Sequence, residues 1–256
     1  MSVKKLLTII FMVPLLLFGA ITSVDKSSGG AAASNPTSAP VTNNAAANTL
    51  AIVMVHASHS TLTNRSATKV IFGNTGNTNM TRFARVDDAS TKQNTFWYIL
   101  SPSSGSNLVS ATFGGTPTVA SLAIKTYAGA AQSGQPDSFS QDVRATATVH
   151  VFTNTTTAAD CLVVQSLLKT LVTGTVTDGS NQTVDFDASV GATYWSHGSY
   201  QILTGGQTGA IVFTNTFSLT SPSINCMGAF SPAAAAAGST NYGYPFTDLR
   251  LMGVGQ

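Results

Sequence analysis

The stretch that most constrains the fold runs from Thr95 to Ala130, TFWYILSPSSGSNLVSATFGGTPTVASLAIKTYAGA. It holds three runs rich in apolar, β-branched and aromatic residues, and Ser, Pro and Gly residues separate them. β-Branched and aromatic side chains favour extended strands, whereas the separating residues favour turns. The pattern therefore predicts a meander of short strands.

The charged residues support the same fold class. All ten acidic residues are aspartates, and charged residues make up 9% of the chain, so the residues that build solvent-exposed helices are scarce. The formal net charge is +2, and the adjacent Lys4 and Lys5 account for it. We therefore expect no basic surface that would bind nucleic acid.

The N-terminus combines Lys4 and Lys5 with an apolar run from Leu6 to Val24. This arrangement is typical of an export signal, so we assign residues 1–24 to a signal peptide or signal anchor that forms an apolar leader helix. Two outcomes stay open: the leader is cleaved, or it is retained as a membrane anchor of about 20 residues. In both cases we expect the rest of the protein to be extracellular or at the cell surface. Membrane contact is expected only through the leader, if it is uncleaved.

Two further segments differ in composition from the body of the chain. Residues 25–47 are poor in large apolar side chains, and we interpret them as a flexible linker that cannot bury enough surface to become ordered. Residues 233–256 begin with an alanine run and are interpreted as a poorly ordered C-terminal tail. The folded domain is therefore expected between residues 48 and 232.

Within this domain, two series of strand-like runs resemble each other. WYIL at 97–100 corresponds to YQIL at 200–203, and in both series a turn with Gly and a strand ending in Phe follow. The period is about 105 residues, which is too long for a solenoid repeat. We expect two similar halves, about 48–131 and 142–232, that each contribute strands to both sheets of a single sandwich. The predicted fold class is all-β: one two-sheet antiparallel sandwich, jelly-roll-like.

Several motifs follow one another in a characteristic order: WYILSPSSG from Trp97, TYAGA from Thr126, DCLVV from Asp160, GSYQIL from Gly198 and AFSP from Ala229. This order resembles a family of secreted two-half β-sandwich domains in bacterial and phage surface proteins, whose activity is largely unknown. The resemblance covers about residues 48–232 and implies an exported display or binding module. It departs from the family in the last strand, where an aromatic residue is expected and Cys226 occupies the region.

The sequence contains no C-x-x-C, H-E-x-x-H, G-x-G-x-x-G or G-x-S-x-G motif and no Walker loop. Glycoside hydrolysis needs two carboxyl groups at a controlled separation, and a chain without Glu has few candidates. His56 and His59 form H-x-x-H, but residues three apart on a strand point to opposite faces. We interpret them as partly exposed residues at a strand end. The protein is therefore not expected to be an enzyme, and a hydrolase is the least favoured reading.

Two side-chain groups suggest a metal site and a cross-link. Asp185 and Asp187, two apart on a strand, share a face and with Asn181 could hold calcium; the alternative is two solvated acids. No other cofactor or metal is expected. Cys161 and Cys226 could form a disulfide in an oxidising compartment, and two buried thiols are the alternative.

The candidate ligand-binding residues are Tyr194, Trp195 and His197, in a segment flanked by glycines that we interpret as a loop. A tryptophan in such a loop can stack on a sugar ring or on a partner protein. The alternative is that Trp195 folds back and closes the end of the sandwich. Trp97, between Phe96 and Tyr98, is expected in the core.

These observations favour an exported, surface-displayed binding or adhesion module without catalytic activity, with a glycan or a surface protein as candidate partner. The alternative is a structural subunit of a coat, appendage or virion that assembles with copies of itself through its neutral faces.

Overall fold

The computed structural model describes residues 20–30, 41–43, 48–73, 78–170 and 173–234. Within these ranges the regular structure is almost entirely β-strand, and the one helix, α1, is a single turn at Leu62–Arg65. The prediction of an all-β protein is confirmed. Most of the predicted leader helix and of the C-terminal tail falls outside the described residues.

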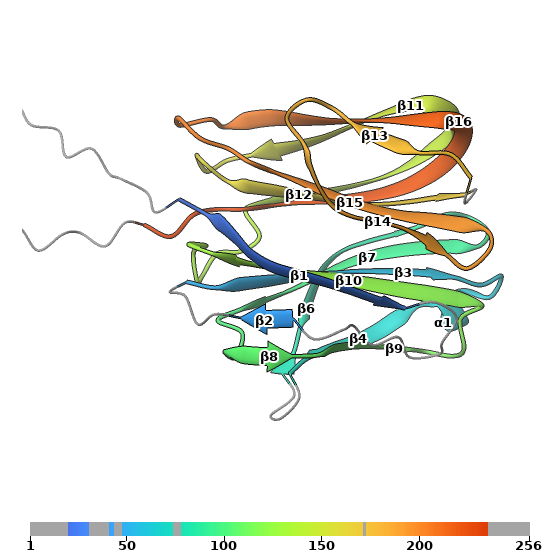
Figure 1. Cartoon of the computed structure of the whole chain (residues 1–256), viewed down its shortest axis with the longest axis horizontal. Coiled ribbons are helices and arrows are strands. Elements are labelled where there is room, and N and C mark those ends of the chain that lie inside the picture. Colours follow the sequence, from blue (N-terminus) through green and yellow to red (C-terminus); the bar gives the residue numbers. More distant parts are fainter. Residues whose placement is uncertain (1–19, 31–40, 44–47, 74–77, 171–172, 235–256) are drawn as a thin grey trace, which may run out of the picture.

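Ten strands come from the first half of the chain: β1 (Thr22–Gly30), β2 (Val41–Asn43), β3 (Leu50–Ser58), β4 (Ala67–Phe72), β5 (Thr78–Asn79), β6 (Thr81–Asp87), β7 (Lys92–Leu100), β8 (Gly105–Asn107), β9 (Val109–Phe113) and β10 (Val119–Ala128). Five of them form a large antiparallel sheet in the order β1-β10-β3-β7-β6. Two small sheets, β5-β4-β9 and β2-β8, cover one of its faces (Figure 1). The apolar cluster between them contains Val53, Phe72, Trp97, Phe113 and Ile124, which confirms Trp97 as a core residue.

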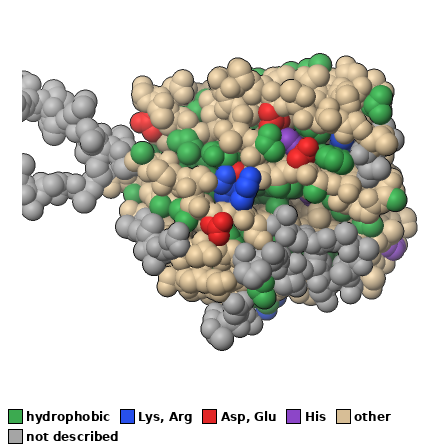
Figure 2. Space-filling view, in the orientation of Figure 1, with side chains coloured by type: hydrophobic (Ala, Val, Ile, Leu, Met, Phe, Trp, Pro, Cys, Tyr) green, Lys and Arg blue, Asp and Glu red, His purple; other side chains and the backbone are tan. Residues whose placement is uncertain are grey.

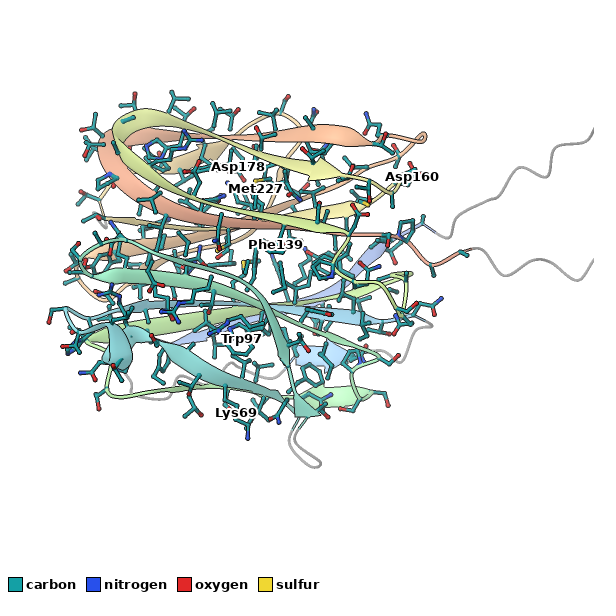
Figure 3. The ribbon with its side chains drawn as sticks, turned by 180° about the vertical axis from the view of Figure 1, so that it is seen from behind. Lys69, Trp97, Phe139, Asp160, Asp178 and Met227 are labelled. Carbon is teal, nitrogen blue, oxygen red and sulfur yellow. The ribbon has the colours of Figure 1, made fainter. Side chains whose placement is uncertain are left out.

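Six strands come from the second half: β11 (Ser138–Thr156), β12 (Leu162–Thr170), β13 (Val176–Asp178), β14 (Thr183–Val190), β15 (Tyr194–Ile202) and β16 (Gly209–Phe230). They form one sheet in the order β11-β16-β12-β15-β14, with β13 paired to β16. The long strands β11 and β16 shift register around Ala147 and bend together, so the sheet folds over itself (Figure 1). The fold encloses a second apolar cluster with Phe152, Val163, Phe213 and Met227, and Figure 3 shows Met227 in this half and Trp97 in the other.

A third apolar cluster joins the two halves, and we call it the shared cluster. It contains Leu50, Ile52, Met54, Phe96 and Tyr127 from the first half and Leu162, Val164, Leu168, Ile224 and Phe230 from the second. Neighbouring side chains on a strand point to opposite faces, so Val53 of β3 enters the first cluster and Ile52 and Met54 enter the shared one. This double burial explains the continuous apolar run of β3.

The arrangement of sheets differs from the prediction. We expected each half to contribute strands to both sheets of one sandwich, but in the described chain each sheet takes its strands from one half alone. The described residues form four sheets, and the two large ones face each other across the shared cluster. A run that is apolar throughout marks burial on both faces, and it carries no information about which strand lies beside it.

The predicted linker differs as well. Residues 22–30, which span the end of the predicted leader and the start of the linker, form β1, paired antiparallel with β10. Residues 41–43 form β2, and the backbone amide of Thr42 donates a hydrogen bond to Asp25 at 2.6 Å. The prediction of a flexible linker is therefore wrong for residues 25–30 and 41–43. Backbone pairing orders β1, although its side chains give no apolar signal.

Candidate functional site

The three residues predicted to bind a ligand lie in strand β15 and not in a loop. Because side chains alternate along a strand, Tyr194 faces the first half, where its hydroxyl lies 3.3 Å from that of Thr91. Trp195 and His197 face the other way and both contact Asp187. The structure therefore brings Trp195 and His197 together and separates Tyr194 from them.

His197 is fully buried between two carboxylates. Its Nε2 lies 2.8 Å from Asp178 Oδ1, and its Nδ1 lies 3.0 Å from Asp187 Oδ1. Burial alone would lower the pKa of His197, but the hydrogen bonds to Asp178 and Asp187 outweigh burial and raise the pKa to about 9. At neutral pH His197 is therefore a cation that donates to both acids. It is an internal ion-pair partner and does not reach a ligand.

Lys169 lies beside this ion pair and was missed by sequence reasoning. Its side chain is fully buried, with Nζ 5.8 Å from the ring centre of Trp195 and 5.3 Å from that of Phe217. Burial lowers the pKa of Lys169, and the charge of Asp187 opposes that shift. The only signal in the sequence is a lysine at the end of the mostly apolar stretch LVVQSLLK.

Asp185 and Asp187, predicted to share a strand face, point in different directions. A register shift between Val184 and Phe186 inserts Asp185 as an extra residue in β14. Asp185 contacts Lys125 of the first half, whereas Asp187 contacts His197, so each carboxylate already has a protein cation as partner. Asn181 lies on the surface, and no described cluster of three or more His, Cys, Asp or Glu residues could hold a metal ion. These three residues do not converge on a calcium site.

Cys161 and Cys226 are both free and buried. Cys161 belongs to the cluster inside the second half, and Cys226 belongs to the shared cluster on the other side of that sheet. Burial raises the pKa of both thiols, to about 12 for Cys161. Of the two alternatives, the structure has two buried thiols, and the predicted disulfide is not formed.

His56 was expected at a partly exposed strand end, but it is buried between the halves. Its Nδ1 contacts the hydroxyl of Ser196, and its Nε2 lies 2.7 Å from the hydroxyl of Ser166. Ser166 in turn donates to Asn94 Oδ1 at 2.8 Å. Burial lowers the pKa of His56 to about 3, so the ring is neutral. Both serines are at most 2% exposed, and a nucleophile needs access to substrate, so this group links strands and does not resemble a reactive serine site.

An open groove follows the outer ends of β14 and β15. One hollow of about 440 Å³ is lined by Asn181, Thr183, Tyr200, Gln201, Ile202, Thr204 and Gln207. A second, of about 120 Å³, is lined by Gly179, Ser180, Asn181, Gln182, Val212 and Thr214. Because Asn181 lines both, they form one surface, which we call the amide groove. Its side chains are mostly amides and hydroxyls without charge. Figure 2 shows one face of the molecule, on which charged side chains are few.

The amide groove is thus an uncharged hollow, whereas the residues proposed from sequence serve internal contacts apart from Asn181. Among the described residues, no helix is long and apolar enough to cross a membrane. The chain matches no protein-family model, no curated protein and no solved structure.

Proposed function

We propose that the protein is an exported, non-catalytic binding module whose ligand is neutral and rich in hydroxyl groups, as a glycan is. The observation that supports this proposal is the lining of the amide groove. Asn and Gln side chains both donate and accept hydrogen bonds, and so can pair with hydroxyl groups in either role. Thr183 and Thr204 add hydroxyl groups that can likewise donate and accept hydrogen bonds.

The proposal includes the architecture that positions the groove. We propose that the two large sheets, packed across the shared cluster, serve as the jelly-roll-like sandwich expected from the sequence, and that the small sheets are an outer cover. The groove then lies at the rim of a rigid scaffold, where binding residues are commonly found. A cell-surface location follows from the leader, and it gives the groove access to extracellular glycans.

A glycan array with the exported protein tests the proposal. We expect binding to neutral glycans, and Asn181→Ala should weaken it by about fivefold, because one hydrogen bond contributes roughly 1 kcal/mol. Thr153→Ala, exposed on β11 and outside the groove, is the matched control and should bind as the wild type does. Absence of signal across the array, or equal binding by Asn181→Ala, would refute the glycan proposal.

A second function, assembly with copies of itself, is favoured by a different surface. On the outer face of β11, Val149 and Val151 are 49% and 45% exposed. β11 also lies at the edge of its sheet, and exposed edge strands can pair with other chains. If the protein is a structural subunit, light scattering should find oligomers that the pair Val149→Lys and Val151→Lys reduces to monomers. A wild-type monomer at all concentrations would exclude this role.

A further inference from the structure

A buried lysine and a buried aspartate meet between the two halves of the molecule. Lys125 lies on β10, in the large sheet of the first half, and Asp185 lies at the bulge of β14, in the second. Their charged groups are in direct contact, and the side chains are 6% and 3% exposed. β10 and β14 are neighbours across the interface between the halves (Figure 1), so this pair is a direct bridge between them.

Aromatic rings and one hydroxyl surround the pair. The hydroxyl of Tyr127 donates to Asp185 Oδ2 at 3.2 Å, and Lys125 Nζ lies 3.7 Å from the ring centre of Tyr200. Burial raises the pKa of Asp185, and the opposing effects of Lys125, Tyr127 and Lys26 leave it above the ordinary value. Removing two charged groups from water costs free energy. A reaction that converts the ammonium and the carboxylate into uncharged groups is therefore favoured at this buried position.

A second buried pair, Lys92 and Asp88, differs from Lys125 and Asp185 in the direction of the pKa shift of its aspartate. Lys92 Nζ lies 3.2 Å from Asp88 Oδ2, with side chains 6% and 11% exposed. Burial raises the pKa of Asp88, but the backbone amides of Lys92 and Thr91 outweigh that effect and lower the pKa overall. Asp88 therefore stays a carboxylate, whereas Asp185 has one hydroxyl donor and a lysine as its side-chain partners.

We propose that Lys125 and Asp185 condense into an intramolecular amide, an isopeptide bond between Nζ and Cγ that covalently joins the two halves. The two groups are held in contact by packed strands. For a reaction between groups positioned in this way, the effective concentration can reach about 10⁵ M or more. No cofactor or oxidant is needed, because the reaction is a loss of water.

The reaction begins with a proton transfer from Lys125 Nζ to Asp185 Oδ1, which gives an amine and a carboxylic acid. The nitrogen lone pair then forms the bond to Cγ, and the π electrons of the Cγ–Oδ2 bond move onto Oδ2. Tyr127 already donates to Oδ2 and stabilises this negative charge, as donors in an oxyanion hole do.

The intermediate then loses water. A second proton passes from Nζ to Oδ1, the Cγ–Oδ1 bond breaks with its electron pair on the departing water, and the double bond to Oδ2 forms again. Ammonium and carboxylate have become an amide and one water molecule, and nothing is oxidised or reduced. A cavity of about 200 Å³, lined by Lys125, Asp185 and the exposed Lys26, gives the water a place to enter and leave.

Mass spectrometry of the full-length expressed protein tests the proposal. We expect an intact mass lower by one water than the mass of the same polypeptide calculated from its sequence, and a digest in which the Lys125 and Asp185 peptides are joined. Lys125→Arg and Asp185→Ala should both restore the calculated mass. Lys92→Arg, at the second buried pair, is the matched control and should still lose one water.

The role of Tyr127 is tested in a time course of newly synthesised protein. Tyr127→Phe should slow the appearance of the joined peptides by about 100-fold, the usual effect of removing one oxyanion donor. A wild-type protein with the full calculated mass overturns the proposal whether or not the variants fold. So does water loss that persists in Lys125→Arg, or a digest that links Asp185 to Lys26. An unchanged rate in Tyr127→Phe overturns the part assigned to that hydroxyl.

Discussion

At the scale of single residues, two buried histidines are held in opposite protonation states. His56 contacts neutral hydroxyl groups, and burial lowers its pKa to about 3. His197 contacts two carboxylates, which overcome burial and raise its pKa to about 9. At neutral pH His56 is therefore neutral and His197 is cationic in the folded protein, whereas each has an ordinary pKa near 6.5 in the unfolded chain.

The two shifts predict a maximum in stability near pH 6.5. His197 binds its proton more tightly in the folded state, so its stabilisation is complete below pH 6.5 and is lost as the pH rises through about 9. His56 resists protonation when folded, so stability falls as the pH drops from 6.5 towards 3. On each side of the maximum, the free energy of unfolding should fall by a few kcal/mol, since a shift of one pKa unit corresponds to about 1.4 kcal/mol.

Urea unfolding across this pH range measures the profile. His197→Gln should flatten the alkaline side alone. His56→Gln should reduce the slope of the acidic side alone, and a smaller slope should remain because burial also lowers the pKa of His150. If either variant keeps the side assigned to its histidine, that assignment is wrong.

At the scale of elements, β1 shows how the N-terminal region depends on backbone pairing. Ile21, just before β1, is 2% exposed in the shared cluster, and an added side chain on Gly129 would lie 2.5 Å from the backbone oxygen of Ala20. Ala20 and Ile21 are thus closely packed against neighbouring residues of the folded protein. If the protein is exported as proposed, processing that preserves the fold must cut before Ile21 or leave the leader in place.

Substitution at the start of β1 tests this dependence. Ile21→Ala should lower the free energy of unfolding by about 2–5 kcal/mol, the usual cost of truncating a buried aliphatic side chain. Thr22→Ala, one residue further and exposed, should change it by less than about 0.5 kcal/mol. N-terminal sequencing of the exported protein provides the second measurement, and a stable form that starts after Gly30 would contradict the assignment.

The same element shows what the sequence could and could not predict. The apolar runs of β3, β7, β10 and β12 were identified as strands because burial on both faces leaves a clear pattern. β1 has no such pattern, because hydrogen bonds to the edge of β10 hold it. The start of β15, with Tyr194, Trp195 and His197, was taken for a loop, because the charge of His197 is balanced by partners that only the strand register reveals.

The candidate site was predicted in part for the same reason. Asn181 was selected from the sequence, although as a calcium ligand, and it is exposed on the amide groove. Gln201 and Gln207 were not selected, since amide side chains on strands and turns are common. They indicate a binding site only when the structure brings several of them to one groove. The partners Asp178 and Lys169 depend on register between strands far apart in sequence, which no local pattern encodes.

At the scale of the whole molecule, the shared cluster makes the two halves depend on each other. Aromatic and aliphatic side chains of both halves are buried there, among them Phe96, Tyr127, Leu168 and Phe230. Separation would expose them to water at a cost of roughly 25 cal/mol per Å² of apolar surface. The halves repeat a similar series of strands, but they should not behave as two independent domains.

The two tryptophans allow this to be measured, because Trp97 lies in the first half and Trp195 in the second. In the single-tryptophan variants Trp97→Phe and Trp195→Phe, urea unfolding followed by fluorescence reports one half at a time. Each variant carries its own loss of stability, so circular dichroism on the same sample provides the reference. We expect the fluorescence and circular dichroism midpoints to coincide in both variants, as cooperative unfolding requires.

Weakening the shared cluster should separate these transitions. Leu168 is 1% exposed in the cluster, so Leu168→Ala leaves a cavity between the halves. In that background the Trp97 and Trp195 transitions should move apart, because each half keeps its own internal cluster. Val212→Ala, at an exposed position of β16, should leave them together. Separate midpoints in the parent single-tryptophan variants would show instead that contact between the halves contributes little to folding, and that each half holds itself together.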